Sequence, residues 1–275
     1  MTHPEDTSSL SPTLKAKLDD HSQYLTNAYA RPPILLSRGE GMWVWDAQGR
    51  KYLDFTAGIA VNALGHADKG VSDVLAEQSQ TLFHTSNVWW NEWTGELAKL
   101  LVQLTRSEGG LGFASGSESG AGAKAFFTNS GTEANEGAIK FARKYGKEVW
   151  AKAAEGRKWQ DSTKTDIVSF TNAFHGRSMG ALSATANPKY QLPFTPLIPG
   201  FKVARYGSVE DVEKLVNEDT CAVLVEPIQG EGGVSTGSVE FLRALRAACD
   251  RVNAVLIYDE IQVRRPRFPC SGVIQ

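Results

Sequence analysis

Acidic side chains end two apolar segments of strand length. Glu226 ends the segment Ala222–Glu226 and Glu231 follows in a glycine-rich stretch, whereas Asp259 ends the segment Ala254–Asp259. In a parallel sheet the carboxyl ends of the strands meet at one edge, and ligands bind there. A carboxylate buried at that edge can keep the nitrogen of a pyridine ring protonated, which turns the ring into an electron sink. A single acid at a strand end is often only a helix cap, but two on neighbouring strands indicate a site.

A second segment, Phe126–Asn135 (FFTNSGTEAN), has the pattern of a strand that turns directly into a helix. Ser130 and Glu133 have the spacing of a capping box, and Gly131 allows a ligand to approach the backbone closely. The exposed N–H groups of the first helical turn, together with the helix dipole, favour a phosphate group. The same residues would equally serve a well-capped helix without a ligand, so this segment alone is a weak indication.

The hexapeptide Asn172–Arg177 (NAFHGR) follows another segment of strand length. Phe174 offers a flat face on which an aromatic ring can stack. Arg177 offers a planar fork of N–H donors that matches a carboxylate. Phe174 and His175 would also serve as ordinary core or rim residues, so both interpretations stay open at this point.

From residue 124 onward, the segments that position these residues alternate between strand and helix periodicity. The expected strands are Lys124–Thr128, Asp166–Phe170, Phe201–Tyr206, Ala222–Glu226 and Ala254–Asp259. The expected helices are Gly131–Tyr145, Val209–Asn217 and Val239–Val252, the last with Val239, Leu242, Leu245, Cys249 and Val252 on one face. Short apolar strands separated by helices predict an α/β fold with a mostly parallel sheet covered on both faces.

The earlier part of the chain has a different pattern. Residues 40–55 predict a hairpin around the turn Asp46–Gly49. Helical periodicity is expected near Leu14–Tyr29, from Gly70 onward and over Glu96–Leu104. The Gly- and Ser-rich stretch Ser107–Gly122 predicts a mobile surface loop, and Ala151–Thr165 reads as a polar insertion.

Composition argues against several classes of partner. With 29 basic and 31 acidic residues in 275, the net charge is −2, which favours neither nucleic acid nor an anionic membrane. No apolar run reaches the ~18 residues of a membrane span. The cysteines form no CxxC pair, so neither a disulfide framework nor a metal site is expected. Cys221 and Cys249 fit a buried, reduced environment, and Cys270 lies in the unusual C-terminal stretch.

Taken together and in this order, several motifs resemble the class III, fold-type-I aminotransferases that depend on pyridoxal 5′-phosphate (PLP), most closely those that act on N-acetylornithine. The motifs are RGEGMWVWDAQGRKYLDFTAGIAVNALGH, FFTNSGTEANEGAIKFARK, FHGRSMGALSAT, VEPIQGEGG and YDEIQ. The resemblance extends from about Leu35 to Gln262. Within it, Gly58–His66 (GIAVNALGH) favours N-acetylornithine over ornithine or 4-aminobutyrate as amino donor.

The resemblance implies a fold-type-I large domain and a role for each matching residue. The cofactor-binding residues would be Ser130, Gly131, Thr132, Phe174, His175, Asp259 and Gln262. The amides after the serine would hold the phosphate, the phenylalanine would stack on the ring, the aspartate would pair with the ring nitrogen, and the glutamine would hydrogen-bond the phenolic oxygen. Substrate would meet Arg177 through a carboxylate. Glu226 and Glu231 would line the site, the latter where relatives adjust specificity between amino donor and keto acid.

The resemblance stops after Gln262. In the family a glycine-rich turn follows, and further on comes the Schiff-base lysine, which binds the cofactor covalently and moves the substrate proton. Here the sequence continues VRRPRFPCSGVIQ, and Lys214 is the last lysine. We therefore expect a truncated chain with an atypical tail, produced by a frame change or an unspliced intron. It would carry the cofactor cradle without the lysine, so no catalytic residue is assigned and the chain is expected to be inactive alone.

The expected organisation is an N-terminal arm with a partial small domain over residues 1–69, an incomplete PLP-binding large domain over 70–262, and the tail over 263–275. By resemblance, the intact family exchanges an amino group between N-acetylornithine and 2-oxoglutarate in arginine biosynthesis, as a homodimer. One alternative is an aminotransferase for ornithine or another ω-amino acid. Another is a non-catalytic isoform that binds PLP weakly or pairs with full-length subunits.

The compartment is predicted from relatives and from the first residues of the chain. Eukaryotic relatives are commonly mitochondrial, which predicts the mitochondrial matrix. The first 20 residues have no apolar core of a secretory signal, and the acids Glu5, Asp6, Asp19 and Asp20 are unusual in a transit peptide. The cytoplasm is therefore the alternative.

Overall fold

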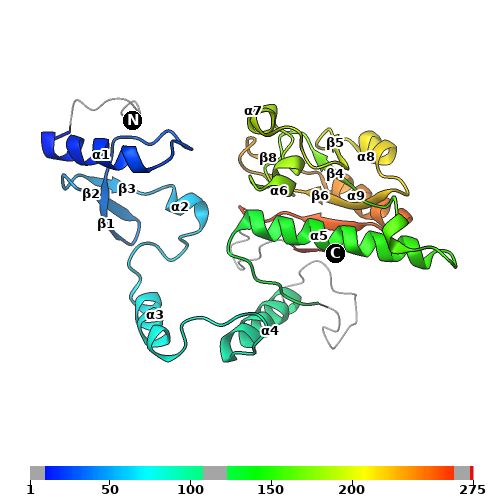
Figure 1. Ribbon diagram of the computed structural model, residues 1–275, viewed down its shortest axis with the longest axis horizontal. Helices are drawn as coiled ribbons and strands as arrows, with labels where there is room; N and C mark the ends of the chain where they lie inside the picture. Colours follow the sequence, from blue (N-terminus) through cyan, green and yellow to red (C-terminus); the bar gives the residue numbers. More distant parts are fainter. Residues whose placement is uncertain (1–9, 108–122, 263–272, 275) are drawn as a thin grey trace. The chain divides into compact units, whose positions relative to one another are not determined.

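The computed structural model describes residues 10–107, 123–262 and 273–274 (Figure 1). The chain divides into two compact units, Met1–Trp89 and Trp90–Gln275. The predicted loop beyond Ser107, Cys270 and most of the predicted tail lie outside the described residues.

The first unit contains a three-stranded antiparallel sheet. Its strands are β1 (Leu36–Glu40), β2 (Trp43–Asp46) and β3 (Lys51–Leu53), paired in that order. The turn between β2 and β3 is closed by Asp46, whose carboxylate accepts hydrogen bonds from the Arg50 guanidinium at 2.6 Å and the Tyr52 hydroxyl at 2.9 Å. The hairpin predicted over residues 40–55 is confirmed.

The helices of the first unit are α1 (Pro12–Tyr24), α2 (Ala57–Ala60) and α3 (Lys69–Thr81). Of these, α1 is shorter than predicted, because Leu25 is extended with φ −100° and ψ 121° and cannot continue the helix to Tyr29. Asp68 caps α3 by accepting the N–H of Val71 at 2.9 Å, so the helical periodicity read from Gly70 is confirmed.

The second unit begins with α4 (Glu92–Ser107), longer at both ends than predicted, and holds a five-stranded sheet of order β10-β9-β6-β4-β5. The strands are β4 (Asp166–Phe170), β5 (Phe201–Ala204), β6 (Thr220–Val225), β9 (Val255–Tyr258) and β10 (Val273–Ile274). All but β10 run parallel, which confirms the predicted α/β sheet. β10 pairs antiparallel with β9, although the prolines and arginines of the tail did not predict a strand.

Helices cover both faces of this sheet, as Figure 1 shows. They are α5 (Gly131–Lys152), α6 (Met179–Ala184), α8 (Val209–Leu215) and α9 (Val239–Val252). The short helix α7 (Pro188–Gln191) follows α6, and β7 (Ile228–Gln229) pairs with β8 (Ser235–Thr236) in a separate two-stranded ribbon. Side chains of each strand alternate between the faces. In β6, for example, Val223 packs toward α8 and α9 whereas Leu224 packs toward α5 and α6.

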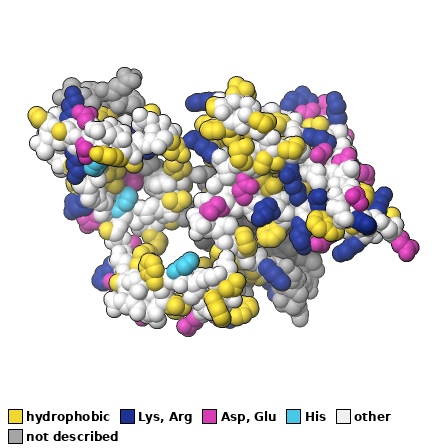
Figure 2. Space-filling view, viewed as in Figure 1, with side chains coloured by type: hydrophobic (Ala, Val, Ile, Leu, Met, Phe, Trp, Pro, Cys, Tyr) yellow, Lys and Arg dark blue, Asp and Glu magenta, His cyan; other side chains and the backbone are white. Residues whose placement is uncertain are grey.

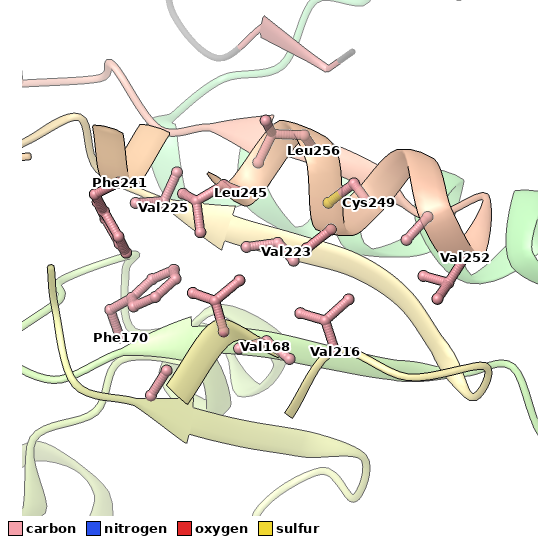
Figure 3. Close-up of a cluster of buried hydrophobic side chains, with 14 of the residues drawn as sticks. Val168, Phe170, Val216, Val223, Val225, Phe241, Leu245, Cys249, Val252 and Leu256 are labelled. Atoms are coloured by element: carbon pink, nitrogen blue, oxygen red, sulfur yellow. The ribbon is translucent and has the colours of Figure 1, made fainter. Parts of the chain in front are cut away.

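The larger core lies between the sheet and α9 (Figure 3). The rings of Phe170 and Phe241 meet edge to face with centroids 5.3 Å apart, and Leu245 is fully buried beside them. The apolar face of α9 differs from the prediction in one respect: Val239 is 63% exposed, and Phe241 takes its place. Burial raises the pKa of Cys249 to about 12, as expected for an inert thiol.

The segment Lys124–Thr128 was predicted as a strand, and this prediction is wrong for the part of the chain that the structure describes. A strand needs a neighbour to pair its backbone N–H and C=O groups, and the segment has none among the described residues. Phe126 is instead 62% exposed, with its ring edge-on to Phe141 of α5 at 5.3 Å.

Hydrophobic side chains gather on the surface of this unit over α6 and α7 (Figure 2). Met179 in α6 is exposed there, as are Leu192 and Phe194, which follow α7. None of the described helices combines the length and the apolar character that a membrane span requires.

Candidate functional site

Asp259 is buried just beyond the carboxyl end of β9, with hydrogen bonds to both carboxylate oxygens. Oδ2 accepts from Nδ2 of Asn135 at 2.9 Å and lies 2.8 Å from Nδ1 of His175. Oδ1 accepts the backbone N–H of Ile261 at 3.1 Å. The carboxylate is therefore fixed in place by residues from three separate segments.

These partners keep Asp259 ionised. Burial disfavours the charged form, but the hydrogen bond and charge of His175 and the hydrogen bond from Asn135 outweigh it, so the pKa of Asp259 lies below its ordinary value. A fixed, buried carboxylate is available at this edge of the sheet at neutral pH.

Asn135 is a site residue that the sequence patterns did not single out. It is 4% exposed on the face of α5 that packs on the sheet, and its Nδ2 also donates to the backbone carbonyl of His175 at 2.7 Å. An amide on an apolar helix face costs free energy unless it is hydrogen-bonded. Its position in line with Ala138, Ile139 and Ala142 was the signal that could have identified it.

The amino-terminal turn of α5 lies next to this carboxylate. Ser130 caps the helix: its Oγ accepts the N–H of Glu133 at 3.3 Å and donates to the Glu133 carboxylate at 2.8 Å. A Cβ on Gly131 would stand 2.7 Å from Cγ2 of Ile261, so the close contact needs a glycine. First-turn amides have no acceptor within their own helix. A suitable anion site therefore contacts Ile261, which follows Asp259 by two residues in the chain.

The loop that carries Phe174 and His175 is fastened to α5. The Thr132 hydroxyl lies 2.8 Å from that of Ser178, and Oε1 of Glu136 accepts from the Ser178 hydroxyl at 2.6 Å. Gly176 has φ +125°, and a Cβ there would overlap the Thr132 side chain. The Thr132 side chain thus positions the loop. The backbone amide of Thr132 is not used for this and can bind a ligand.

Glu226 faces the same loop from the end of β6. Its Oε2 accepts the N–H of Phe174 at 3.0 Å, and the residue is 5% exposed. Burial raises the pKa of Glu226 to about 7, against the lowering effect of His175 and of the Phe174 amide. A carboxyl group with such a pKa can take up and release a proton near neutrality.

The rim of the site brings together Phe174, Arg177, Tyr190 and Glu231. The rings of Phe174 and Tyr190 meet edge to face with centroids 5.8 Å apart, and the Arg177 guanidinium carbon lies 5.0 Å from the Tyr190 centroid. The Tyr190 hydroxyl donates to the Glu231 carboxylate at 2.5 Å. Tyr190 was not predicted, because nothing in its local sequence distinguishes it from a surface tyrosine.

The glycine-rich segment after Glu226 closes the arrangement. Gly232 lies against the backbone of Asn172, where a Cβ would overlap the carbonyl group. A Cβ on Gly230 would stand 3.8 Å from Cβ of Gln262, which brings the exposed Gln262 to the same edge. All the residues predicted for the site therefore lie in segments that meet at the carboxyl edge of the sheet.

Comparison with known proteins identifies a family. The profile described as aminotransferase class III matches residues 24–265. The mitochondrial acetylornithine aminotransferase of Neurospora crassa is 50% identical over 262 residues, which cover 95% of this chain and 53% of that protein. Its counterpart in Yarrowia lipolytica is 48% identical over 245 residues, covering 89% and 55%. The chain thus spans about half the length of the curated relatives it matches.

Solved structures agree with the fold. The ornithine aminotransferase of Toxoplasma gondii superimposes with a TM-score of 0.76 at 29% identity, covering 94% of this chain and 56% of that one. The N-acetylornithine aminotransferase of Stenotrophomonas maltophilia gives a TM-score of 0.65 at 34% identity, covering 88% and 53%. With its motifs, its parallel sheet and the profile match, this chain belongs to the class III aminotransferase family.

Proposed function

We propose that this site serves the PLP-dependent transfer of an amino group from N-acetylornithine to 2-oxoglutarate, a reaction of arginine biosynthesis. The observation that carries the proposal is the Asp259 carboxylate, held by His175 and Asn135 beside the first turn of α5. The relatives named acetylornithine aminotransferase support the donor. A T. gondii ornithine aminotransferase structure with partial occupancy of PLP at its active site supports the cofactor.

The residues present fit this cofactor. The phosphate would bind the amides of Gly131 and Thr132, where a helix amino terminus favours an anion. Oδ1 of Asp259 accepts one hydrogen bond, from Ile261, and a carboxylate oxygen can accept a second. That capacity suits a protonated ring nitrogen. When bound, PLP supplies an electron sink that stabilises negative charge on the α-carbon of the substrate.

Each side chain then has a definite task. Asp259 would hold the proton on the ring nitrogen, because its own low pKa keeps it anionic. Phe174 would contact the ring face, and Gln262 the phenolic oxygen. Arg177 would bind a substrate carboxylate with its planar fork. Glu226 and Glu231 would line the substrate side.

Amino-group transfer also requires an amine that moves the substrate proton. The family resemblance assigns this task to a lysine beyond the YDEIQ motif, and residues 263–275 contain none. We propose that the side chains of this site bind PLP without a covalent bond to a lysine. Borohydride reduction after PLP loading tests this directly: a stoichiometric PLP adduct on one lysine, seen by mass spectrometry, would contradict it.

Equilibrium dialysis with PLP tests the cofactor assignment. The parent chain should bind PLP, and Asp259→Asn should weaken binding because the ring nitrogen loses its anionic partner. Asp250→Asn is the matched control, since Asp250 lies in α9 with its side chain 66% exposed. Equal affinities of parent and Asp259→Asn would refute the role of Asp259.

The donor is tested by competition. On the PLP-loaded chain, N-acetylornithine should displace bound glutarate at a lower concentration than ornithine or 4-aminobutyrate does. N-succinylornithine belongs in the same series, because a succinylornithine transaminase of Yersinia pseudotuberculosis is 44% identical over 252 residues. A preference for ornithine would favour the alternative donor.

Two further proposals concern the cellular context. The fungal relatives are named mitochondrial, which supports the mitochondrial matrix as the compartment. Cell fractionation with an antibody to the chain tests this, and a cytosolic signal would support the alternative. Pairing as a homodimer, or with full-length subunits, is tested by co-purification of differently tagged chains.

A further inference from the structure

A phenol stands between two opposite charges at the rim of the site. The Tyr190 hydroxyl donates to Oε1 of Glu231 at 2.5 Å, and the Arg177 guanidinium lies against the face of the same ring, 5.0 Å from its centroid. Tyr190 and Glu231 are 41 residues apart in the chain, so tertiary structure brings them together. The ring is held from another side by its edge-on contact with Phe174.

The hydrogen bond determines where the charge of Glu231 stands. Glu231 is exposed, on a glycine-rich segment, and its side chain has several rotatable bonds. A hydrogen bond from a phenol to a carboxylate is charge-assisted and therefore among the stronger ones. The Glu231 hydrogen bond raises the pKa of Tyr190, with burial and the Glu231 charge adding to it, against the lowering effect of Arg177. Tyr190 consequently keeps its proton and remains a donor at neutral pH.

We infer that Tyr190 is a positioning residue: by holding the Glu231 carboxylate, it keeps that negative charge away from a substrate carboxylate bound at Arg177. The inference rests on the proposed function and adds a determinant of keto-acid specificity to it. A Glu231 carboxylate released from Tyr190 would compete for the guanidinium fork that a substrate carboxylate needs. It would also repel the ligand in proportion to the ligand's charge. Tyr190 therefore favours a dicarboxylate over a monocarboxylate at this rim.

The test is a double-mutant cycle on the PLP-loaded chain, with glutarate and butyrate as unreactive dicarboxylate and monocarboxylate probes. Calorimetric titration is made on the parent, Tyr190→Phe, Glu231→Gln and the double variant. Tyr145→Phe is the matched control, because Tyr145 is a half-exposed tyrosine on α5. Tyr190→Phe should weaken glutarate binding by about threefold to tenfold, the range of one net hydrogen bond. Butyrate should be affected less, and PLP affinity should not change.

The cycle decides between positioning and a merely structural role. In the Glu231→Gln background, Tyr190→Phe should have no further effect on glutarate. Equal weakening in both backgrounds would overturn the inference, and so would a PLP-loaded parent that does not bind glutarate.

A second measurement needs no ligand. The difference in tyrosinate absorbance between the parent and Tyr190→Phe gives the titration of Tyr190, and Glu231→Gln should shift it to lower pH. An unchanged titration would contradict the hydrogen bond and with it the inference. Failure of the chain to bind PLP would instead overturn the proposed function, and the phenol titration would still decide the role of Tyr190.

Discussion

Nδ1 of His175 lies 2.8 Å from Oδ2 of Asp259, although 84 residues separate the two along the chain. Both side chains are buried, one in the loop after β4 and the other beyond the end of β9. Removing one partner of such a pair leaves the other without compensation in a medium of low polarity. The contact therefore ties the geometry of the site to the stability of the sheet.

Asp259→Asn should lower the free energy of unfolding at pH 7 by about 1–3 kcal/mol, because a charge-assisted hydrogen bond is weakened. The loss should depend on pH. The folded pKa of Asp259 is lowered from 3.8, so its stabilising contribution is present above that value and disappears as pH falls through the folded pKa. Urea unfolding at pH 7 and pH 3 should show the larger difference at pH 7; equal losses would contradict this assignment.

Glu226→Gln should act with the opposite dependence. The folded pKa of Glu226 is raised from 4.5 to about 7, so its neutral form is preserved in the folded state and stability is lost as pH rises through this window. The variant should gain stability over the parent at pH 8, and this gain should be smaller at pH 5. The free energies of unfolding gained at the two pH values should differ on the order of 1–3 kcal/mol. Glu210→Gln, with an 86% exposed side chain, is the control and should show no such trend.

Gly131→Ala should weaken PLP binding by about tenfold, because the new methyl group must displace Ile261 next to the phosphate-binding turn. Gly137→Ala lies in the same helix, and its Cβ would stand 3.4 Å from the Phe126 ring. This control should keep PLP affinity and gain about 0.5–1 kcal/mol of stability, as expected for Gly to Ala inside a helix. Similar losses of affinity in both variants would show that the loss does not come from the contact between Gly131 and Ile261.

Lys164→Met should destabilise the second unit by about 1–3 kcal/mol, since it leaves buried carbonyl groups without a donor. Nζ of Lys164 donates to the carbonyl of Val252 at 2.6 Å and to that of Glu218 at 3.1 Å, and the residue is 2% exposed. Lys214→Met on the exposed side of α8 is the control. Thermal unfolding of both variants measures the difference, and equal melting temperatures would argue against this role.

The sequence predicted those parts of the fold that local pattern determines. The bounds of β4 and α9 agree with the prediction, because an apolar run and an amphipathic period are properties of the segments themselves. For the same reason the pattern placed Glu226 and Asp259 at the ends of their strands, and they directly follow β6 and β9. Asn135 and Tyr190 were missed, since their importance comes from partners more than 40 residues away. Lys124–Thr128 failed as a strand because pairing depends on a neighbour that a local pattern does not contain.

The hydrogen bond between Asn135 and Asp259 spans 124 residues, which has a consequence for synthesis. A ribosome releases the first turn of α5 and the loop of His175 long before it releases β9. Until then Asn135 and His175 lack the Asp259 carboxylate as their hydrogen-bond partner. The growing chain therefore contains most of the cofactor-binding residues before they can assemble into a site. PLP supplied during translation should therefore associate with the chain only after residue 259 has emerged from the exit tunnel.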